Sequence, residues 1–220
     1  MLEDLIAERR KKLERLKKEG VNPYPARVKR NVSIGRLLTE FDARAKSGEK
    51  AALAGRIRSI RDQGGVIFFD VADESGKIQV VLKKDALKSF DLLKETLDEG
   101  DFVVVAGKLF TTERGEKSIA AESVEVAAKS LRPVPSERYG LEDTETRLRK
   151  RYLDILLIPD VKELFYRKSV FWQATRDYLR KSDFLEVETP VLESIPGGAE
   201  AEPFVTHHNA LDTDFYLRIS

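Results

Sequence analysis

Cysteine is absent from this sequence of 220 residues, and methionine and tryptophan occur once each. Without cysteine the chain can form no disulfide, no cysteine-ligated zinc site and no cysteine nucleophile. Histidine is almost as scarce, because the only two are the neighbours His207 and His208. Neighbouring residues of a strand point to opposite faces, so we expect no metal site at this pair.

Long apolar runs are also missing. No stretch approaches the length of a transmembrane helix, and the first residues form a charged amphipathic segment rather than an apolar signal segment. We therefore expect a cytoplasmic protein with no membrane partner. Hydrophobic residues make up 41% of the chain, which is enough to build the core of one large domain or two modest ones.

A large net charge is the third absence, since 39 basic residues almost cancel 38 acidic ones. The balance changes along the chain. Residues 1–30 contain ten Lys and Arg against five Asp and Glu, whereas residues 51–130 contain twelve against fourteen. If the middle of the chain binds RNA, it must therefore do so through specific contacts more than through a general positive field.

The N-terminal segment 2–19 has the pattern of a basic amphipathic helix that ends at Gly20. Its apolar positions at helical spacing are Leu2, Ile6, Leu13 and Leu16. Such a helix can pack on its own domain or contact RNA, and the pattern favours neither reading. A second short helix is predicted over residues 33–47, with Ser33 as its cap. The inward residues expected there are Leu37, Leu38 and Phe41.

The hydrophobic period then changes to that of short strands separated by glycine-containing turns. The predicted strands are Ala51–Asp62, Val66–Val71, Lys77–Lys83, Phe102–Phe110 and Ser118–Ala127. A helix is predicted over Asp85–Leu97, between the third and fourth strands. Three strands, a helix and two strands is the order of an OB-fold barrel, so the chain is expected to be α+β with a five-stranded OB-fold domain.

One face of this barrel carries a candidate nucleic-acid site. Ile67, Phe69 and Val71 share the core face of the second strand, so Phe68 faces outward with Gln79 of the third strand beside it. Arg61 has the parity of a core residue, so its outward position requires a bend or bulge. Glu116 is expected at the tip of the last hairpin. An outward aromatic ring on an OB-fold can stack on an unpaired base. The alternative is that this ring packs under a neighbouring loop and that the polar groups are ordinary surface.

The prolines of Leu131–Pro135 predict a domain boundary within residues 131–140. Helices are expected over 142–158 and 160–182, followed by an extended segment that begins at Phe184 and stops at Pro190. The second helix is predicted to direct one apolar face inward, formed by Val161, Leu164, Phe165, Val170, Phe171 and Leu179.

The final segment contains FLEVETPVL and IPGGAEAEPFVTHHNALDTDFYLRI. The first run resembles motif 1, the dimer-interface motif of class II aminoacyl-tRNA synthetases. The second closely resembles the lysyl-tRNA synthetases of that class. NPYP, GEKS, LRPVP and RLRKRYLDIL are similar to the same family, so the resemblance extends over nearly the whole chain. Aspartyl- and asparaginyl-tRNA synthetases share the OB domain but lack the PGGA…PFVTHHN…YLRI run.

The resemblance implies that the OB domain reads the U-rich anticodon of tRNA(Lys). The stacking phenylalanine of the family matches Phe68, and its polar anticodon contacts match Arg61, Gln79 and Glu116. Gly197 and Gly198 match the glycine pair beside the lysine pocket, although a tight turn would also require glycine. Pro190 matches the end of the dimer-interface motif. Asp183 and Glu202 depart from the residues usual in the family.

The family reaction is ATP- and Mg²⁺-dependent activation of lysine by a homodimer, followed by transfer to tRNA. Nothing in the sequence matches the arginine-bearing motifs 2 and 3, so no catalytic residue is assigned and residues 141–220 are expected to be an incomplete catalytic domain with an exposed sheet edge. The expected organisation is residues 1–50 as a helical extension, 51–130 as the OB domain, 131–140 as a linker and 141–220 as the start of the catalytic domain. Alone, the chain is expected to bind tRNA only. The alternatives are a stand-alone tRNA-binding module and a different class II synthetase.

Overall fold

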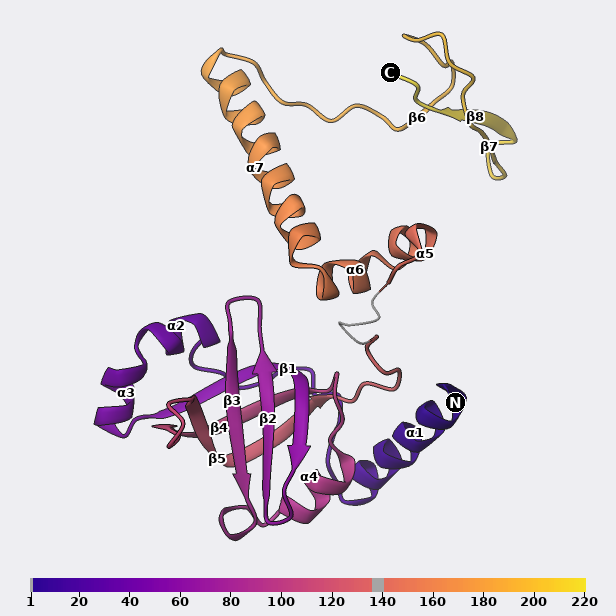
Figure 1. Cartoon of the computed structure of the whole chain (residues 1–220). Helices are drawn as coiled ribbons and strands as arrows, with labels where there is room; N and C mark the ends of the chain where they lie inside the picture. Colours follow the sequence, from indigo (N-terminus) through magenta and orange to yellow (C-terminus); the bar gives the residue numbers. More distant parts are fainter. Residues whose placement is uncertain (1, 136–140) are drawn as a thin grey trace. The chain divides into compact units, whose positions relative to one another are not determined.

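The computed structural model describes residues 2–135 and 141–220, and the chain divides into two units, 1–142 and 143–220 (Figure 1). Residues 136–140, the second half of the predicted linker, lie outside the described residues. No helix among those described is both long and apolar enough to cross a membrane.

Five strands of the first unit close into a barrel in the order β1-β2-β3-β5-β4, in which β3 and β5 pair in parallel. The strands are β1 Lys50–Asp62, β2 Val66–Ala72, β3 Lys77–Lys83, β4 Phe102–Thr111 and β5 Lys117–Ala128. Each predicted strand is present, with ends within one residue of those expected. The helix α4, Phe90–Thr96, lies between β3 and β4 in the chain. This order confirms the OB-fold and the α+β class.

The barrel interior is filled by alternate residues of each strand, because successive side chains point to opposite faces. Ile67, Phe69 and Val71 of β2 are buried as predicted, and the inward residues of β3 pack with them. On the third strand, Gln79 and Val81 of the outer face are buried as well. Parallel pairing with β5 places the β4–β5 hairpin beside this outer face.

The predicted helix Asp85–Leu97 is only partly correct. A single 3₁₀ turn, η1, covers Lys84–Ala86, and Leu87 that follows it has an extended backbone (φ −129°, ψ 115°), so α4 begins only at Phe90. The backbone N–H of Lys84 donates to the carbonyl of Gly65 (3.0 Å), which ties this turn to the β1–β2 loop. Asp85 and Ala86 belong to this turn, so they cannot also form the start of the predicted continuous helix.

The N-terminal helix α1, Leu2–Lys18, packs against the rest of the first unit through Ile6, Leu13 and Leu16, whereas Leu2 is exposed. It terminates at Gly20, whose positive φ of 75° suits glycine. Arg9 is buried in the same face and donates to the carbonyl oxygens of Glu99 (3.0 Å) and Ser130 (3.0 Å). The packing interpretation of this helix is therefore the one that the structure supports, and RNA contact remains untested.

The predicted helix 33–47 is two helices, α2 (Ile34–Thr39) and α3 (Phe41–Ser47), which meet at Glu40. Ser33 occupies the cap position of α2 but makes no side-chain cap bond. Instead, Asp73 from the β2–β3 turn accepts the N–H of Ile34 (2.9 Å). A carboxylate distant in sequence replaces the local cap, and no local pattern could have indicated it.

The second unit contains three helices and a small sheet among its described residues. The helices are α5 Thr144–Arg149, α6 Arg151–Leu157 and α7 Pro159–Lys181; the strands β6 Leu192–Glu193, β7 Val205–His208 and β8 Thr213–Leu217 pair in the order β6-β8-β7. The predicted single helix 142–158 is therefore wrong. It breaks at Lys150, where Asp154 pairs with both Arg147 and Arg151.

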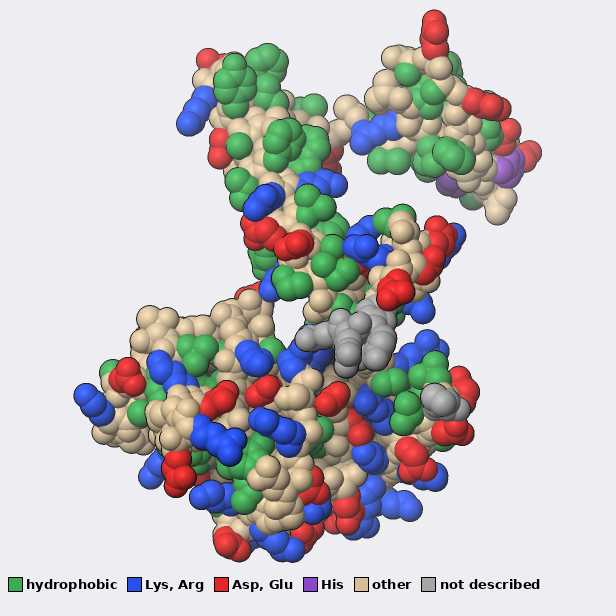
Figure 2. All heavy atoms as spheres, viewed as in Figure 1, with side chains coloured by type: hydrophobic (Ala, Val, Ile, Leu, Met, Phe, Trp, Pro, Cys, Tyr) green, Lys and Arg blue, Asp and Glu red, His purple; other side chains and the backbone are tan. Residues whose placement is uncertain are grey.

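The predicted inward face of α7 is also wrong, because none of its residues is buried. Figure 2 shows hydrophobic side chains gathered along this helix, whereas charged side chains of both signs are scattered over the visible barrel surface. The exposed apolar residues of α7 include Leu164, Phe165, Val170, Phe171 and Leu179. An amphipathic pattern specifies which face of a helix is apolar, but it does not specify what covers that face.

Candidate nucleic-acid interface

A hollow of about 490 Å³ lies where the adjoining ends of β1, β2 and β3 meet the β4–β5 hairpin. Its wall contains Arg61, Phe68, Gln79 and Glu116, the four residues that the sequence pattern groups on one surface. The structure thus brings together side chains from four separate segments. Their role in binding remains a prediction.

The position of Arg61 depends on a bulge in β1. Ile57 pairs with Val71 but Ser59 pairs with Asp70, so the register slips by one residue between them. Beyond the bulge, Arg61 lies directly opposite Phe68. Residues directly opposite in an antiparallel pair share a face, so the bulge turns Arg61 from the core face to the outer face. The sequence parity required such a bulge, and the structure contains it.

Phe68 provides the aromatic surface of the hollow. It lies opposite Val81 in the β2–β3 pairing and is partly buried rather than fully covered by a loop. Val66 and Phe110 line the same wall. The ring is therefore supported by apolar neighbours while part of it stays accessible, as a platform for base stacking requires.

The solvent exposure of Gln79 is lower than its outward position in the strand predicts. It lies on the outer face of β3, as expected, but only 7% of its surface is accessible. The cause is the parallel neighbour β5, which pairs Gln79 with Ser118 and brings the hairpin alongside. The Ser118 hydroxyl donates to Oε1 of Gln79 at 3.1 Å. Gln79 thus forms part of an enclosed wall instead of an open surface.

Glu116 is held at the rim by the turn of the β4–β5 hairpin. The N–H of Thr112 donates to the carbonyl of Glu116 (2.9 Å), and the N–H of Glu116 donates to the hydroxyl of Thr112 (3.0 Å). Gly115 adopts the positive φ (83°) that this turn needs. The backbone of Glu116 is therefore fixed while its side chain remains exposed.

Sequence reasoning missed several residues of the hollow. Lys83, Glu113 and Arg114 add charges to the rim, so that with Arg61 and Glu116 it contains three cations and two carboxylates. Val81 could have been predicted, because it shares the outward strand parity of Gln79. The hairpin residues Glu113 and Arg114 could not, since strand parity does not determine the position of a hairpin relative to the other strands. Cations at the rim suit phosphate, and carboxylates suit donor groups on base edges.

The β1–β2 loop beside the hollow is fastened to α4. Lys94 of α4 pairs with Asp62 (2.9 Å) and donates to the carbonyl of Gly64 (3.2 Å). The N–H of Gly64 donates to Asp62 (2.9 Å). Hydrogen bonds from Lys94 and then from Gly64 lower the pKa of the Asp62 carboxyl. Lys94 therefore restrains a loop that OB-folds use for ligand contact.

The predicted lysine-pocket glycines of the second unit occupy a turn. Gly198 has φ of 90°, and a Cβ added there would lie 2.2 Å from Oγ of Ser220. The Ser220 hydroxyl donates to the carbonyl of Gly197 (3.1 Å). The positive φ thus favours glycine at 198, whereas a Cβ at Gly197 would meet no atom within 4 Å. Contact with lysine stays a prediction, as does the dimer role of the exposed Pro190.

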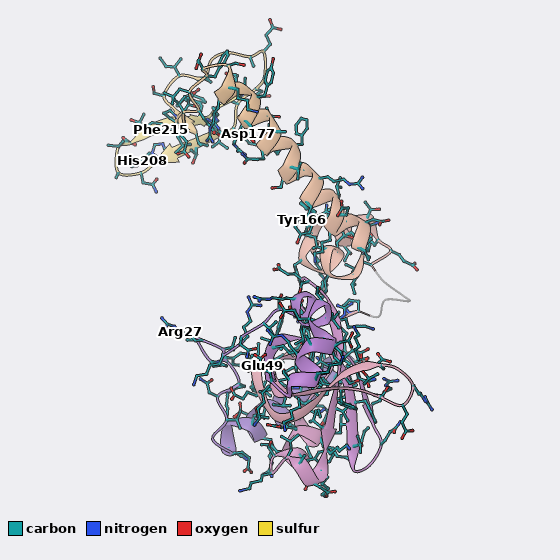
Figure 3. All side chains as sticks on the ribbon, turned by 90° about the vertical axis from the view of Figure 1, so that its left-hand side faces the viewer. Arg27, Glu49, Tyr166, Asp177, His208 and Phe215 are labelled. Carbon is teal, nitrogen blue, oxygen red and sulfur yellow. The ribbon has the colours of Figure 1, made fainter. Side chains whose placement is uncertain are left out.

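The side chains of the two histidines contact different residues. His207 Nδ1 is 2.8 Å from Oδ1 of Asp214 on the neighbouring strand, and the ring of His208 lies 6.0 Å from that of Phe215. Figure 3 shows His208 and Phe215 on the paired strands β7 and β8. Each ring therefore serves the local strand pairing.

Comparison with protein families divides the chain in the same two parts. Residues 51–127 match the family model of the OB-fold nucleic acid binding domain. Residues 143–220 match that of the class II tRNA synthetases for D, K and N. The first match covers the barrel and the hollow, and the second covers the helices and sheet that follow.

Several curated bacterial proteins are similar to the whole chain. A lysine–tRNA ligase of Halalkalibacterium halodurans is 42% identical over 226 residues, which cover 100% of this chain and 45% of the relative. One of Dehalococcoides mccartyi is 44% identical and covers 99% of this chain and 45% of the relative. One of Roseiflexus sp. is 43% identical with 100% and 45% coverage. The chain spans slightly less than half the length of these relatives, and over that length its sequence is similar to the lysine–tRNA ligases, with a second part that matches the class II tRNA synthetases for D, K and N.

Proposed function

We propose that the hollow on the barrel binds the anticodon loop of tRNA(Lys), so that this chain provides anticodon recognition to a lysine–tRNA ligase. The observation that carries the proposal is the partly accessible ring of Phe68 with Arg61 directly opposite it. An OB-fold binds oligonucleotides on its second and third strands and on the loops beside them, where this hollow lies.

Each wall residue has a chemical task in this proposal. An unpaired base stacks on Phe68, which contributes about 1–3 kcal/mol per base. Gln79 and Glu116 form hydrogen bonds with the edges of bases that are splayed out of the loop. Arg61 contacts a phosphate or stacks on a neighbouring base. Selection of U-rich loops follows from the edge contacts rather than from charge, because the rim is of mixed sign.

For the whole protein we propose the ligation of lysine to tRNA(Lys), with ATP and Mg²⁺ supplying the activation chemistry in a homodimer. In this proposal Gly197 and Gly198 border the lysine pocket and Pro190 belongs to the dimer interface. No three His, Asp or Glu side chains of residues 2–135 and 141–220 are grouped as metal ligands. We assign no catalytic step to a residue of this chain, because its sequence matches neither of the arginine-bearing motifs 2 and 3.

The test is binding of a fluorescent RNA stem-loop that contains the lysine anticodon, followed by anisotropy. Phe68→Ala is expected to weaken binding about tenfold, since it removes the stacking surface. Phe102→Ala is the matched control, because Phe102 is a 40% exposed aromatic residue of β4 outside the hollow wall. Equal affinity for the lysine stem-loop and for one with an unrelated anticodon would contradict the proposal.

A further inference from the structure

The wall of the hollow contains a second aromatic ring, that of Phe110 on β4. Like Phe68, Phe110 is partly buried and lines the hollow. In the barrel order, β3 and β5 lie between the two strands that carry these rings. Among the residues that the structure describes, no ring contact joins Phe68 to Phe110. The hollow therefore presents two separate rings, and stacking of a base on Phe68 uses only one of them.

The register of the barrel places a lysine beside Phe110 on the outer face of β4. In the pairing with β5, Phe110 lies opposite Ser118 and Lys108 lies opposite Ala120. Leu109 between them is buried in the core, so the side chains of Phe110 and Lys108 share the outer face. Two residues of a strand span about 7 Å, which places an aromatic ring and a cation within reach of one nucleotide.

Lys108 is available to bind an anion. Its side chain is exposed, and it forms no ion pair with any residue in the described part of the chain. Glu122, two residues along β5 from Ala120, is 2.6 Å from Nζ of Lys50, the residue that lies opposite Lys108 on β1. The carboxylate of β5 that is closest in register is thus bound by another lysine, and the charge of Lys108 is left uncompensated.

Lys108 also lies in the same row of the barrel as Phe68. Across the strands, Phe68 pairs with Val81, Val81 with Ala120, and Ala120 with Lys108. Residues that are partners in a sheet share a face, so this row runs over the outer surface from β2 to β4. An RNA strand that places one base on Phe68 can follow the row across β3 and β5 toward Lys108 and Phe110.

We propose that Phe110 and Lys108 form a second nucleotide subsite of the hollow, in which an unpaired base stacks on Phe110 and its phosphate contacts Lys108. Aromatic rings interleaved with cations are the combination that binds single-stranded nucleic acid. Stacking accepts any base, so this subsite adds affinity without adding selectivity. The inference rests on the proposed function and extends it from one stacked base to two.

The test pairs each ring with each base of the loop in a double-mutant cycle. The full chain and its variants bind fluorescent stem-loops with the lysine anticodon, in which one loop nucleotide at a time is abasic, and anisotropy measures the affinity. Phe110→Leu removes the ring but keeps an apolar side chain, and it is expected to weaken binding of the intact loop about fivefold. The loss should vanish at one abasic position, which should differ from the position where the loss from Phe68→Leu vanishes.

Phe102→Leu is the matched control, because Phe102 is an exposed aromatic residue of the same strand outside the hollow. Phe110→Tyr keeps the stacking surface and should bind like the wild-type chain. Melting curves verify that each compared variant is folded.

Lys108→Ala tests the phosphate contact independently of the ring. Loss of one contact to a single strand is expected to reduce the slope of log affinity against log salt concentration by about 0.7. Lys29→Ala is the control, since Lys29 is exposed in the segment between α1 and α2 and lies outside the hollow.

Two results would overturn the inference while Phe68→Leu still weakens binding. One is an unchanged affinity of Phe110→Leu together with an unchanged salt slope of Lys108→Ala. The other is a loss from Phe110→Leu that vanishes at the same abasic position as the loss from Phe68→Leu, since both rings would then hold one base. If Phe68→Leu binds like the wild-type chain and the lysine anticodon is not preferred, the proposed function fails instead, so the two failures are distinguishable.

Discussion

The two units of this chain use their apolar residues differently. In the first unit, strands and helices bury a continuous core that includes Phe41, Phe69 and Phe90. In the second unit, Asp154 is the one buried residue among those described, and aromatic residues such as Phe171 and Trp172 are exposed. Both units have hydrophobic periodicity in their sequence, yet only in the first unit do the apolar residues form a buried core.

The difference lies in closure. In the barrel each strand has a partner on both sides, and the face that it buries is covered by strands of the same unit. The second unit has a sheet of three short strands and a helix, α7, whose apolar face has no cover within the unit. A hydrophobic pattern therefore stabilises a fold only where another apolar surface of suitable shape is present.

The largest expected effect tests this contrast directly. Phe69→Ala removes a ring that is 0% accessible and should lower the free energy of unfolding of the barrel by about 3–5 kcal/mol. Phe171→Ala removes a ring that is 63% accessible and should change stability by less than about 0.5 kcal/mol. Hydrogen exchange of the barrel strand amides in urea reports on the barrel, whereas fluorescence of Trp172, the single tryptophan, reports on α7.

If Phe69→Ala shifted the fluorescence transition of Trp172 as much as the barrel transition, the two units would unfold together and the contrast between them would be wrong. Phe171→Ala serves as the matched control, since it removes the same side chain from an exposed position.

Most of the barrel could be predicted from the sequence because its determinants are local. Alternating residues and glycine turns set the five strands, and the parity of Arg61 even required the bulge near Arg58. The burial of Gln79 could not be predicted in this way, since it depends on β5 pairing with β3 in parallel across about 40 residues of chain. The site residues were grouped correctly, but the shape of the hollow depends on that distant pairing.

The helix cap of α2 and the buried ion pairs could also not be predicted from the sequence. Asp73 caps α2 from a turn that is distant in the sequence, and Lys129 fills a buried position between two carboxylates. Such pairs obey no fixed spacing, because the fold alone brings their atoms together. In the second unit, the periodicity of α7 predicted an apolar face correctly, and only its burial was wrong.

A smaller but still large effect is expected from Lys129, which is part of what makes the first unit compact. Its ammonium group is inaccessible and lies 2.7 Å from both Oδ2 of Asp101 and the carbonyl oxygen of Thr96. Lys129→Ala would leave the buried carboxylate of Asp101 without its cation and should destabilise the barrel by about 3 kcal/mol. Because Lys12 of α1 pairs with the adjacent Asp98 (2.6 Å), hydrogen exchange of α1 should accelerate as well.

Lys29→Ala is the control for this substitution, since Lys29 is exposed in the segment between α1 and α2. Equal effects of the two substitutions on urea unfolding would show that the buried ion cluster contributes nothing beyond an exposed lysine.

The smallest expected effect is the pH dependence of the same cluster. Burial raises the pKa of the Asp98 carboxyl, but hydrogen bonds from Lys12 and Lys129 outweigh burial and leave the pKa below its ordinary value of 3.8. A depressed pKa stabilises the fold above the ordinary pKa, and this contribution is lost as the pH falls through the pKa of the folded state. For Asp101, burial prevails and raises the pKa, which has the opposite sign: its contribution is present at low pH and is lost as the pH rises through the raised pKa.

Asp98→Asn separates the two carboxylates. At pH 7 the variant should be less stable than the wild-type chain by about 1 kcal/mol, because it lacks the ionised partner of Lys12 and Lys129. As the pH falls through the lowered pKa of the folded state, the wild-type carboxylate is protonated, so the two stabilities should converge. Urea unfolding at several pH values measures the gap. A gap of constant size from neutral to acidic pH would mean that the ionisation of Asp98 does not support the docking of α1, and that the apolar packing of Ile6, Leu13 and Leu16 and the hydrogen bonds of Arg9 hold this helix on the barrel.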